Sequence, residues 1–318
     1  MPAASNDQGR AFEYIFTNIL HDEIAKYRNV EIEQNSSLIA AKHAWNSISP
    51  IIRSNLEEAA KASCNTLFDA EVLMTERGDD TLVLKLQPDS AGEEGDVRDI
   101  LAIRGDINWE IGFSLKHNHF AVKHSRLSMS IDFGKQWYGI DCSDDYWNGI
   151  TPIFDYVSSY KAANMDWSDM GDEKVSRVYK PLLEEFVKEI QRAYEYDIKM
   201  CTKMVEYLLG KHDFYKVVAQ DARRNTEIQT YNVHGTLNKP GATKTPSIVI
   251  PTTELPTRII HIGLIPDSDN KVELSFDKGW YFTFRIHNAS TKVENSLKFN
   301  IQLTGMPTSI ITINCPWD

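Results

Sequence analysis

Two β-rich runs, residues 97–104 and 108–116, are separated by only Gly-Asp-Ile, and this spacing limits the fold more than any other feature of the chain. A Gly-Asp pair in so short a connection is typical of a β-hairpin. If the turn centres on the Asp-Ile pair, Asp99 lies opposite Ser114. Because side chains alternate between the two faces of a strand, Asp99, Ser114 and Lys116 then share one face. The sequence therefore predicts an antiparallel pair that presents a carboxylate and a lysine together.

Three stretches have the periodicity of amphipathic helices. In residues 6–27 the apolar side chains recur every three to four positions, which places them on one side of a helix. A second helical stretch covers about residues 38–62. The third covers about residues 172–209, where Pro181 suggests the start of the main helix and Gly210 its end.

Strand signals fill much of the remaining chain. Residues 67–75 and 81–87 are predicted to be strands, and residues 246–318 contain several more β-rich runs. Such a mixture of helices and strands indicates an α/β protein. Residues 1–165 would form the core, residues 166–245 a helical arm, and the remainder a β-rich C-terminal region.

Composition excludes several classes of protein. With 318 residues, 42% of them hydrophobic and 25% charged, the chain resembles a globular protein with room for two domains. It has no run of eighteen apolar residues, so we expect no membrane-spanning helix. The N-terminal stretch lacks the apolar segment of a signal peptide, and the four cysteines form no CxxC pair. These features favour a cytoplasmic protein without a zinc site built on cysteine pairs.

Charge is unevenly distributed along the chain. The formal net charge is −11, and yet residues 116–135 contain four Lys or Arg against one acidic residue. Residues 199–224 contain six Lys or Arg against three acidic residues. Two separate solvated faces would explain these basic stretches, and so would one surface for an anionic partner. An acidic total alone argues only weakly against a nucleic-acid partner.

A carboxylate and a lysine on adjacent strands suit phosphodiester hydrolysis. The carboxylate of Asp99 would hold a divalent cation against the phosphate, and Lys116 would orient the attacking water and help to deprotonate it. An ordinary cross-strand ion pair on a solvated face is the alternative. The basic stretch that follows, residues 117–127, favours a nuclease, because we expect it to form a helix whose cations bind phosphates.

Longer motifs give a family resemblance. The hairpin resembles the PD-(D/E)xK nuclease pattern, with Asp99 as the first acid and Ser114-Leu115-Lys116 at the second motif. More narrowly, the segments "GDVRDI" and "WEIGFSLKHNHFAVKHSRLS" resemble the HaeIII-type type II restriction endonucleases. The N-terminal "SNDQGRAFEY" and the late "FRIHNASTKVENSLKFNIQL" resemble the same family, so the resemblance covers most of the chain.

This resemblance implies a restriction-endonuclease-like core, in which helices flank a mixed sheet. It also implies a need for Mg²⁺ and hydrolysis of both strands of double-stranded DNA at a short palindrome. For HaeIII-type enzymes the palindrome is GGCC, which is cut in the middle to blunt ends. Residues 1–165 would then be the catalytic nuclease core, residues 166–245 a helical arm with DNA contacts, and residues 246–318 a β-rich DNA-recognition region. A cognate DNA methyltransferase would act on the same site.

Other functions and assembly states remain open at this point. A homodimer would cut both strands, and so would a monomer that cuts them one after the other. A non-catalytic DNA-binding protein would keep the basic stretches without a metal site. A structure-selective repair nuclease of the same superfamily would keep the metal site and lack the palindrome.

The resemblance also implies roles for individual residues. Asp99 would bind the metal, Lys116 would act on the water, and the backbone carbonyl of Leu115 would contact the metal. Glu13, in "GRAFE", matches an accessory glutamate that many such nucleases place beside the metal. Ser114 departs from the pattern, because a hydroxyl is a poor Mg²⁺ ligand compared with a carboxylate. We expect Glu13 to supply the missing charge, with Ser114 holding a water molecule beside the ion.

Two other acids are alternative members of the site. Asp96 precedes Asp99 at the start of the same strand and would serve as the first acid instead. Glu71, on an earlier predicted strand, is a further candidate. Glu110 shares the face of Ser114, but four residues of strand separate the two by about 13 Å, which is too far for a direct replacement.

Basic residues after the hairpin and late in the chain are candidates for DNA contacts. The letters His-Asn-His at residues 117–119 do not form an HNH motif, whose residues are spread over a ββα unit; binding of a transition metal is an alternative use of the two histidines. Arginine or lysine best reads the O6 and N7 atoms of guanine in the major groove, so Arg223 and Arg224 are candidates for base reading, and Arg285 is a further one. Contacts to phosphates or water are the alternative for each. The candidates for DNA contacts are His119, Lys123, His124, Arg126, Arg223, Arg224 and Arg285.

Overall fold

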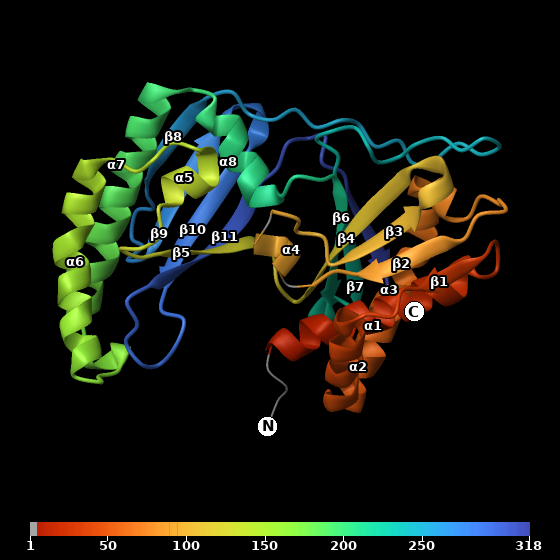
Figure 1. Cartoon of the computed structure of the whole chain (residues 1–318), viewed down its shortest axis with the longest axis horizontal. Coiled ribbons are helices and arrows are strands. Elements are labelled where there is room, and N and C mark those ends of the chain that lie inside the picture. The colour runs from red at the N-terminus through yellow and green to blue at the C-terminus, as the bar shows by residue number, and fades with distance from the viewer. Residues whose placement is uncertain (1–4, 89, 94) are drawn as a thin grey trace. The chain divides into compact units, whose positions relative to one another are not determined.

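The chain forms two compact units in this computed structural model, and each unit is assembled from separate segments of sequence (Figure 1). The first unit contains Met1–Phe120, Gly210–Glu254 and Thr308–Asp318, and the second contains Ala121–Leu209 and Leu255–Pro307. The chain therefore passes between units after residues 120, 209, 254 and 307, and the boundaries predicted at 165 and 245 fall inside them. The structure describes residues 5–88, 90–93 and 95–318.

The first unit is built on a mixed sheet of seven strands in the order β1-β2-β3-β4-β6-β7-β12 (Figure 1). The pairs β1–β2 and β4–β6 are parallel, and the other neighbours are antiparallel. This mixed sheet with flanking helices confirms the predicted α/β class. Its strands are β1 (Val30–Ile32), β2 (Leu82–Leu86), β3 (Ile100–Arg104), β4 (Trp109–His117), β6 (Phe214–Gln220), β7 (Asn225–Tyr231) and β12 (Thr312–Pro316).

Helices cover the apolar face of this sheet. The predicted N-terminal helix forms, and its side chains Phe12, Phe16 and Leu20 are fully buried at a spacing of four residues. The ring of Phe16 lies 5.4 Å from that of Phe113 in β4, which fixes the helix against the centre of the sheet. The helices of this unit are α1 (Ser5–Ile24), α2 (Ser36–Ser47), α3 (Pro50–Ala70) and the short α4 (Ser90–Glu93).

The prediction for residues 38–75 was wrong in two respects. The single helix predicted over 38–62 is two helices, because Ser49 caps a new helix whose first residue is Pro50. The strand predicted over 67–75 is instead the end of α3 followed by the 3-10 helix Val72–Met74. The buried side chains of α3 keep their helical spacing to the end of the helix, at Leu67 and Ala70. Packing of this face therefore outweighs the local preference for a strand.

The second unit is built on an antiparallel sheet of five strands in the order β5-β11-β10-β9-β8. Helices pack on one face of it, where the ring of Phe186 in α7 lies 5.5 Å from Phe284 and 5.0 Å from Phe299. Its strands are β5 (Ala121–Leu127), β8 (Ile259–Leu264), β9 (Lys271–Phe276), β10 (Tyr281–His287) and β11 (Leu297–Gly305). Its helices are α5 (Phe133–Tyr138), α6 (Asp144–Ala162), α7 (Lys180–Tyr196) and α8 (Met200–Leu209), with a π-helix at Lys174–Tyr179.

Several elements lie outside the places that the sequence predicted. Residues 121–127 form strand β5, so the helix predicted after Lys116 was wrong. Strands β6 and β7, within the predicted helical arm, pair with β4 and each other in the first sheet. The last strand, β12, also joins the first sheet. None of the helices in the described part of the chain is long and apolar enough to cross a membrane.

Candidate active site

The hairpin of β3 and β4 has the predicted register, with Ile100 paired to Phe113. Beyond this pair, the Oδ2 atom of Asp99 accepts three hydrogen bonds from β4. The donors are the backbone N of Leu115 at 2.6 Å, Oγ of Ser114 at 3.3 Å and Nζ of Lys116 at 3.3 Å. The structure therefore brings these four predicted residues together at one carboxylate.

Beyond the last paired residue of β3, the end of β4 has no neighbouring strand on the β3 side, although β6 pairs with it on the other side. In an extended strand the N–H and C=O of one residue point to the same side. The N–H of Leu115 points toward Asp99, so its carbonyl also lies on that side, past the last paired residue of β3. All three hydrogen bonds to Asp99 fall on Oδ2, and in the described part of the chain Oδ1 accepts none. The geometry thus leaves one carboxylate oxygen and one backbone carbonyl available for a metal ion.

A small cavity of about 180 Å³ adjoins Asp99. Glu13 of α1 and Asp96 also line it, so the predicted accessory glutamate and the alternative first acid reach the same space as Asp99. Glu13 lies at the border of the buried stripe of α1 and is half-buried. Among the described residues, no three His, Cys, Asp or Glu side chains form a cluster that could hold a metal ion. Any ion here would therefore need the backbone carbonyl and water as further ligands.

Asp96 is held by an arginine. Its carboxylate pairs with Arg98 at 2.7 Å and accepts a hydrogen bond from Gln87 at 2.8 Å. Burial raises the pKa of Asp96, but the bonds from Arg98 and Gln87 outweigh burial and lower it. Arg98 also pairs with Glu110, and its side chain crosses β4 at Gly112, where an added Cβ would lie 2.1 Å from Arg98 Cδ. Asp96 is thus less available to a metal than Asp99.

Glu71 lies apart from this cavity, in the core at the end of α3. Its Oε1 accepts hydrogen bonds from the hydroxyl of Tyr215 and the backbone N of Asn238, both at 2.6 Å. Burial raises the pKa of Glu71 to about 7, even though both hydrogen bonds lower it. The structure therefore gives Glu71 a structural role and does not bring it to Asp99.

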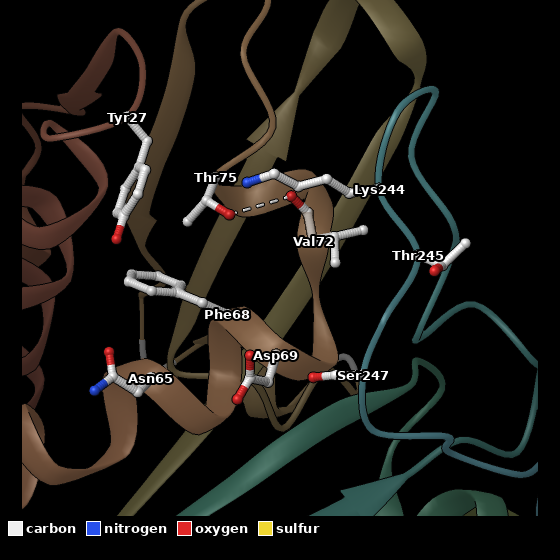
Figure 2. A pocket seen from close by; sticks show the side chains of 9 residues that line it. All are labelled: Tyr27, Asn65, Phe68, Asp69, Val72, Thr75, Lys244, Thr245 and Ser247. Atoms are coloured by element: carbon white, nitrogen blue, oxygen red, sulfur yellow. Dashed lines mark hydrogen bonds between the residues drawn. The ribbon is translucent and has the colours of Figure 1, made fainter.

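A larger hollow of about 580 Å³ lies near the same end of α3 (Figure 2). Its walls include Tyr27, Phe68 and Asp69, with Lys244 reaching over from a loop. None of the residues predicted to act in catalysis lines it. Size alone therefore does not identify the site, and the smaller cavity at Asp99 has the groups that hydrolysis needs.

Lys216, on β6, is a neighbour of the site that sequence reasoning missed. The parallel register of β4 and β6 pairs it with Ser114, and its Nζ donates to the backbone carbonyl of Phe120 at 2.8 Å. Burial and the charge of Lys116 lower the pKa of Lys216 to about 7, although Glu227 raises it. The basic stretch in the sequence contained Lys216, but nothing local indicated that its strand would lie beside β4.

His117 joins three elements at the end of β4. Its Nε2 lies 2.9 Å from the carboxylate of Asp221, which follows β6, and its Nδ1 lies 3.1 Å from Gln8 Oε1 in α1. Asn118 accepts a hydrogen bond from the backbone N of Asp221 at 3.0 Å. His117 is thus engaged in holding the strand end to its neighbours. Among the described residues, His117 and His119 belong to no group of three or more side chains that could hold a metal ion, so nothing there supports the alternative transition-metal site.

Comparison with known proteins decides the family. The HaeIII restriction endonuclease family model matches residues 9–307, which includes parts of both compact units. The chain belongs to this family. It is also 46% identical to the type II restriction enzyme HaeIII of Haemophilus aegyptius over 319 residues, covering 100% of both chains. No solved structure matches the chain.

The protein is therefore a type II restriction endonuclease, a site-specific deoxyribonuclease that binds double-stranded DNA. This confirms the predicted family and enzyme class. It also disfavours the two alternatives considered from the sequence, a non-catalytic DNA-binding protein and a structure-selective repair nuclease.

The predicted DNA-contact residues lie in different settings. In the first unit, His119 is half-buried after β4, Arg223 is exposed, and Arg224 pairs with Glu58 at 3.2 Å. In the second unit, Lys123 points to the helix side, where its Nζ donates to the carbonyl of Tyr207 at 2.9 Å and lies 3.7 Å from the centre of that ring. The remaining candidates, His124, Arg126 and Arg285, lie on the opposite face of the five-stranded sheet.

Proposed function

We propose that this enzyme hydrolyses double-stranded DNA at GGCC in a Mg²⁺-dependent reaction and leaves blunt ends. The observation that carries the catalytic part is the meeting of Ser114, Leu115 and Lys116 at the carboxylate of Asp99. The GGCC specificity is supported by the resemblance to HaeIII-type enzymes and by the 46% identity to HaeIII. The proposed catalytic residues are Asp99, Lys116, Glu13 and Ser114.

The donor set around the cavity suits Mg²⁺. This ion prefers oxygen ligands and retains several waters, so one or two carboxylates suffice to hold it against a phosphate. Here the protein ligands would be two carboxylates, those of Asp99 and Glu13, and one neutral oxygen, the carbonyl of Leu115. When bound, the ion supplies Lewis-acid stabilisation of the charge that develops on the phosphate.

Lys116 would act on the water molecule. Its Nζ donates to Asp99 Oδ2 at 3.3 Å, which fixes the amine beside the carboxylate that faces the phosphate. From this position Lys116 would orient the water for attack on phosphorus and, as a neutral amine, would take a proton from it. The P–O bond to the leaving strand then breaks, and the leaving oxygen takes up a proton from solvent. Ser114, held by the same carboxylate at 3.3 Å, would position a second water beside the ion.

Other parts of this proposal concern the setting of the enzyme. We place its action in the cytoplasm, and its four cysteines, all buried free thiols, fit a reducing compartment. A cognate DNA methyltransferase would act on the same site without needing to bind the enzyme. A homodimer would cut both strands in one binding event, and sedimentation with and without DNA would test it.

Plasmid cleavage tests the function directly. Purified protein would be incubated with a plasmid that contains GGCC sites, in Mg²⁺ and separately in EDTA, and the fragment ends would be sequenced. We expect blunt ends between the central G and C in Mg²⁺ and intact plasmid in EDTA. Ends at another sequence would refute the specificity, and cutting in EDTA would refute the metal requirement.

A further inference from the structure

The five-stranded sheet of the second unit has two unlike faces. On one face, apolar side chains such as Val272, Phe284 and Phe299 are buried, and the two aromatic rings pack on helix α7. On the other face the alternate residues of the same strands are mostly polar or charged, because successive side chains point in opposite directions. This polar sheet face contains His124 and Arg126 of β5, Lys298 and Asn300 of β11, Arg285 and His287 of β10, and Lys271 of β9.

The strand register arranges these side chains in two rows. In the first row His124 lies opposite Asn300, Asn300 opposite Arg285, and Arg285 opposite Lys271, so the row crosses four neighbouring strands. Both Arg285 and Lys271 are exposed. The second row crosses three strands and consists of Arg126, Lys298 and His287.

The polar sheet face is cationic although the whole chain carries a formal net charge of −11. One of its four Lys or Arg side chains, Arg126, pairs with Glu294 at 3.3 Å. In the part of the chain that the structure describes, Arg285, Lys298 and Lys271 form no ion pair. Glu273 also lies on this face, where it pairs with His261 and accepts a hydrogen bond from Tyr281. Three cations outside ion pairs still outnumber this carboxylate, and such a face is complementary to a polyanion.

We propose that the polar sheet face binds the DNA duplex, with Arg285 reading a guanine and Lys298 and Lys271 contacting phosphates. Adjacent strands lie about 4.8 Å apart, so the first row spans about 14 Å, close to the width of about 12 Å of a major groove. An inner member such as Arg285 then faces base edges, and an outer member such as Lys271 faces a phosphate strand. The guanidinium offers two donors to O6 and N7 of guanine.

Double-stranded DNA is the occupant that both the charge and the enzyme's activity favour. Phosphate oxygens receive half or more of the hydrogen bonds in protein–DNA interfaces, mostly from Lys, Arg and small polar side chains. The cationic and amide groups of the polar sheet face match that chemistry. The base-reading role of Arg285 rests on the proposed GGCC specificity, whereas the phosphate contacts need only a duplex.

Filter binding without metal tests the proposal on the full chain. Affinity would be measured for a GGCC duplex and a scrambled duplex over a range of salt concentrations. We expect Arg285→Ala to weaken binding to GGCC at least about tenfold with little change on the scrambled duplex. Arg285→Lys should lose part of the same preference while it keeps the charge, because lysine lacks the planar, preorganised fork of two nitrogen donors. Lys298→Ala and Lys271→Ala should weaken both duplexes alike and each reduce the salt slope by about one.

Lys188→Ala is the matched control, since this exposed lysine lies on helix α7 and pairs with Glu185. A triple variant of Arg285, Lys298 and Lys271 that binds both duplexes as tightly as the Lys188→Ala control would overturn the proposal. Melting temperatures would show that each variant is folded. If the wild type itself cleaves plasmid at another sequence, the GGCC assignment fails while the salt slopes still test the polar sheet face.

Discussion

At the scale of single residues, Lys116 is the side chain on which hydrolysis should depend most. It is partly exposed and bonds to Asp99, so its removal leaves the core intact. We expect Lys116→Ala to keep its fold and its DNA affinity while the initial rate of plasmid cleavage falls at least about a hundredfold, the scale of losing a positioned acid–base group. Lys85→Ala, on the same sheet and paired with Glu33, is the control. Cleavage near the wild-type rate would place the catalytic lysine elsewhere.

Glu13 is tested by the metal requirement. Its loss should remove one of the two carboxylates proposed to hold the ion, so for Glu13→Gln the Mg²⁺ concentration at half-maximal cleavage should rise by about tenfold. Its half-buried position at the helix border predicts little change in melting temperature. Glu23→Gln, on the same helix and paired with Lys26, should have no effect. If Asp96→Asn shifts the titration and Glu13→Gln does not, Asp96 is the second acid.

The substitution Ser114→Glu tests whether the proposed metal site lacks a carboxylate ligand. The substitution adds a carboxylate next to Asp99 and Glu13, and like charges raise each other's pKa values. Activity should therefore fall, most steeply at low pH, in a pH–rate profile. Ser114→Gln has the same size without the charge, so it isolates the effect of crowding in this buried position. A higher rate for Ser114→Glu than for the wild type would show that the natural site is one carboxylate short.

At the scale of elements, Glu71 at the end of α3 should make the free energy of unfolding depend on pH. The pKa of Glu71 is raised from 4.5 to about 7 in the folded protein, chiefly by burial. The unfolded chain therefore loses this proton first, and the free energy of unfolding should fall as the pH rises from about 4.5 to about 7, by up to about 3 kcal/mol. In Glu71→Gln, chemical denaturation over this range should lack that fall.

A second glutamate at this helix end provides the comparison. Glu76 accepts hydrogen bonds from the backbone and hydroxyl of Thr243, chiefly the former, and these lower its pKa. A lowered pKa gives stability that is lost as the pH falls, the opposite of Glu71. Glu76→Gln should therefore leave the decline between pH 4.5 and 7 in place. A decline that persists in Glu71→Gln would mean that another group causes it.

At the scale of the whole molecule, catalysis and the proposed DNA contacts occupy different units. Asp99 and Lys116 lie in the first unit, and the polar sheet face lies in the second. We therefore expect EDTA to abolish cleavage while affinity for a scrambled duplex stays within about threefold, because phosphate binding depends on Lys and Arg. The two measurements would be made on one preparation at one salt concentration. Loss of both together would tie DNA binding to the metal site.

Local signals were enough for several features of this protein. The hairpin register follows from a short turn and the alternation of side chains, so the meeting of Asp99 with Ser114 and Lys116 was predictable. The proline and the glycine at the ends of the long helical stretch marked real boundaries, because their backbone preferences act locally. Pro50 carries the same kind of local signal. It marks the start of α3, at a point where a single continuous helix was predicted.

The sequence by itself determined the family, the hairpin and the helical stretches that contain α1, α2, α3, α7 and α8, but α5 and α6 were not predicted. The tertiary structure decided which strands share a sheet. Strand β6 lies beside β4 across almost a hundred residues of chain, and that pairing alone places Lys216 next to Ser114. Strand β5 leaves the first unit directly after the hairpin, and its pairing with β11 aligns His124 with Asn300. Such pairings depend on burying apolar faces between distant segments, and the local periodicity of one segment does not encode its partner.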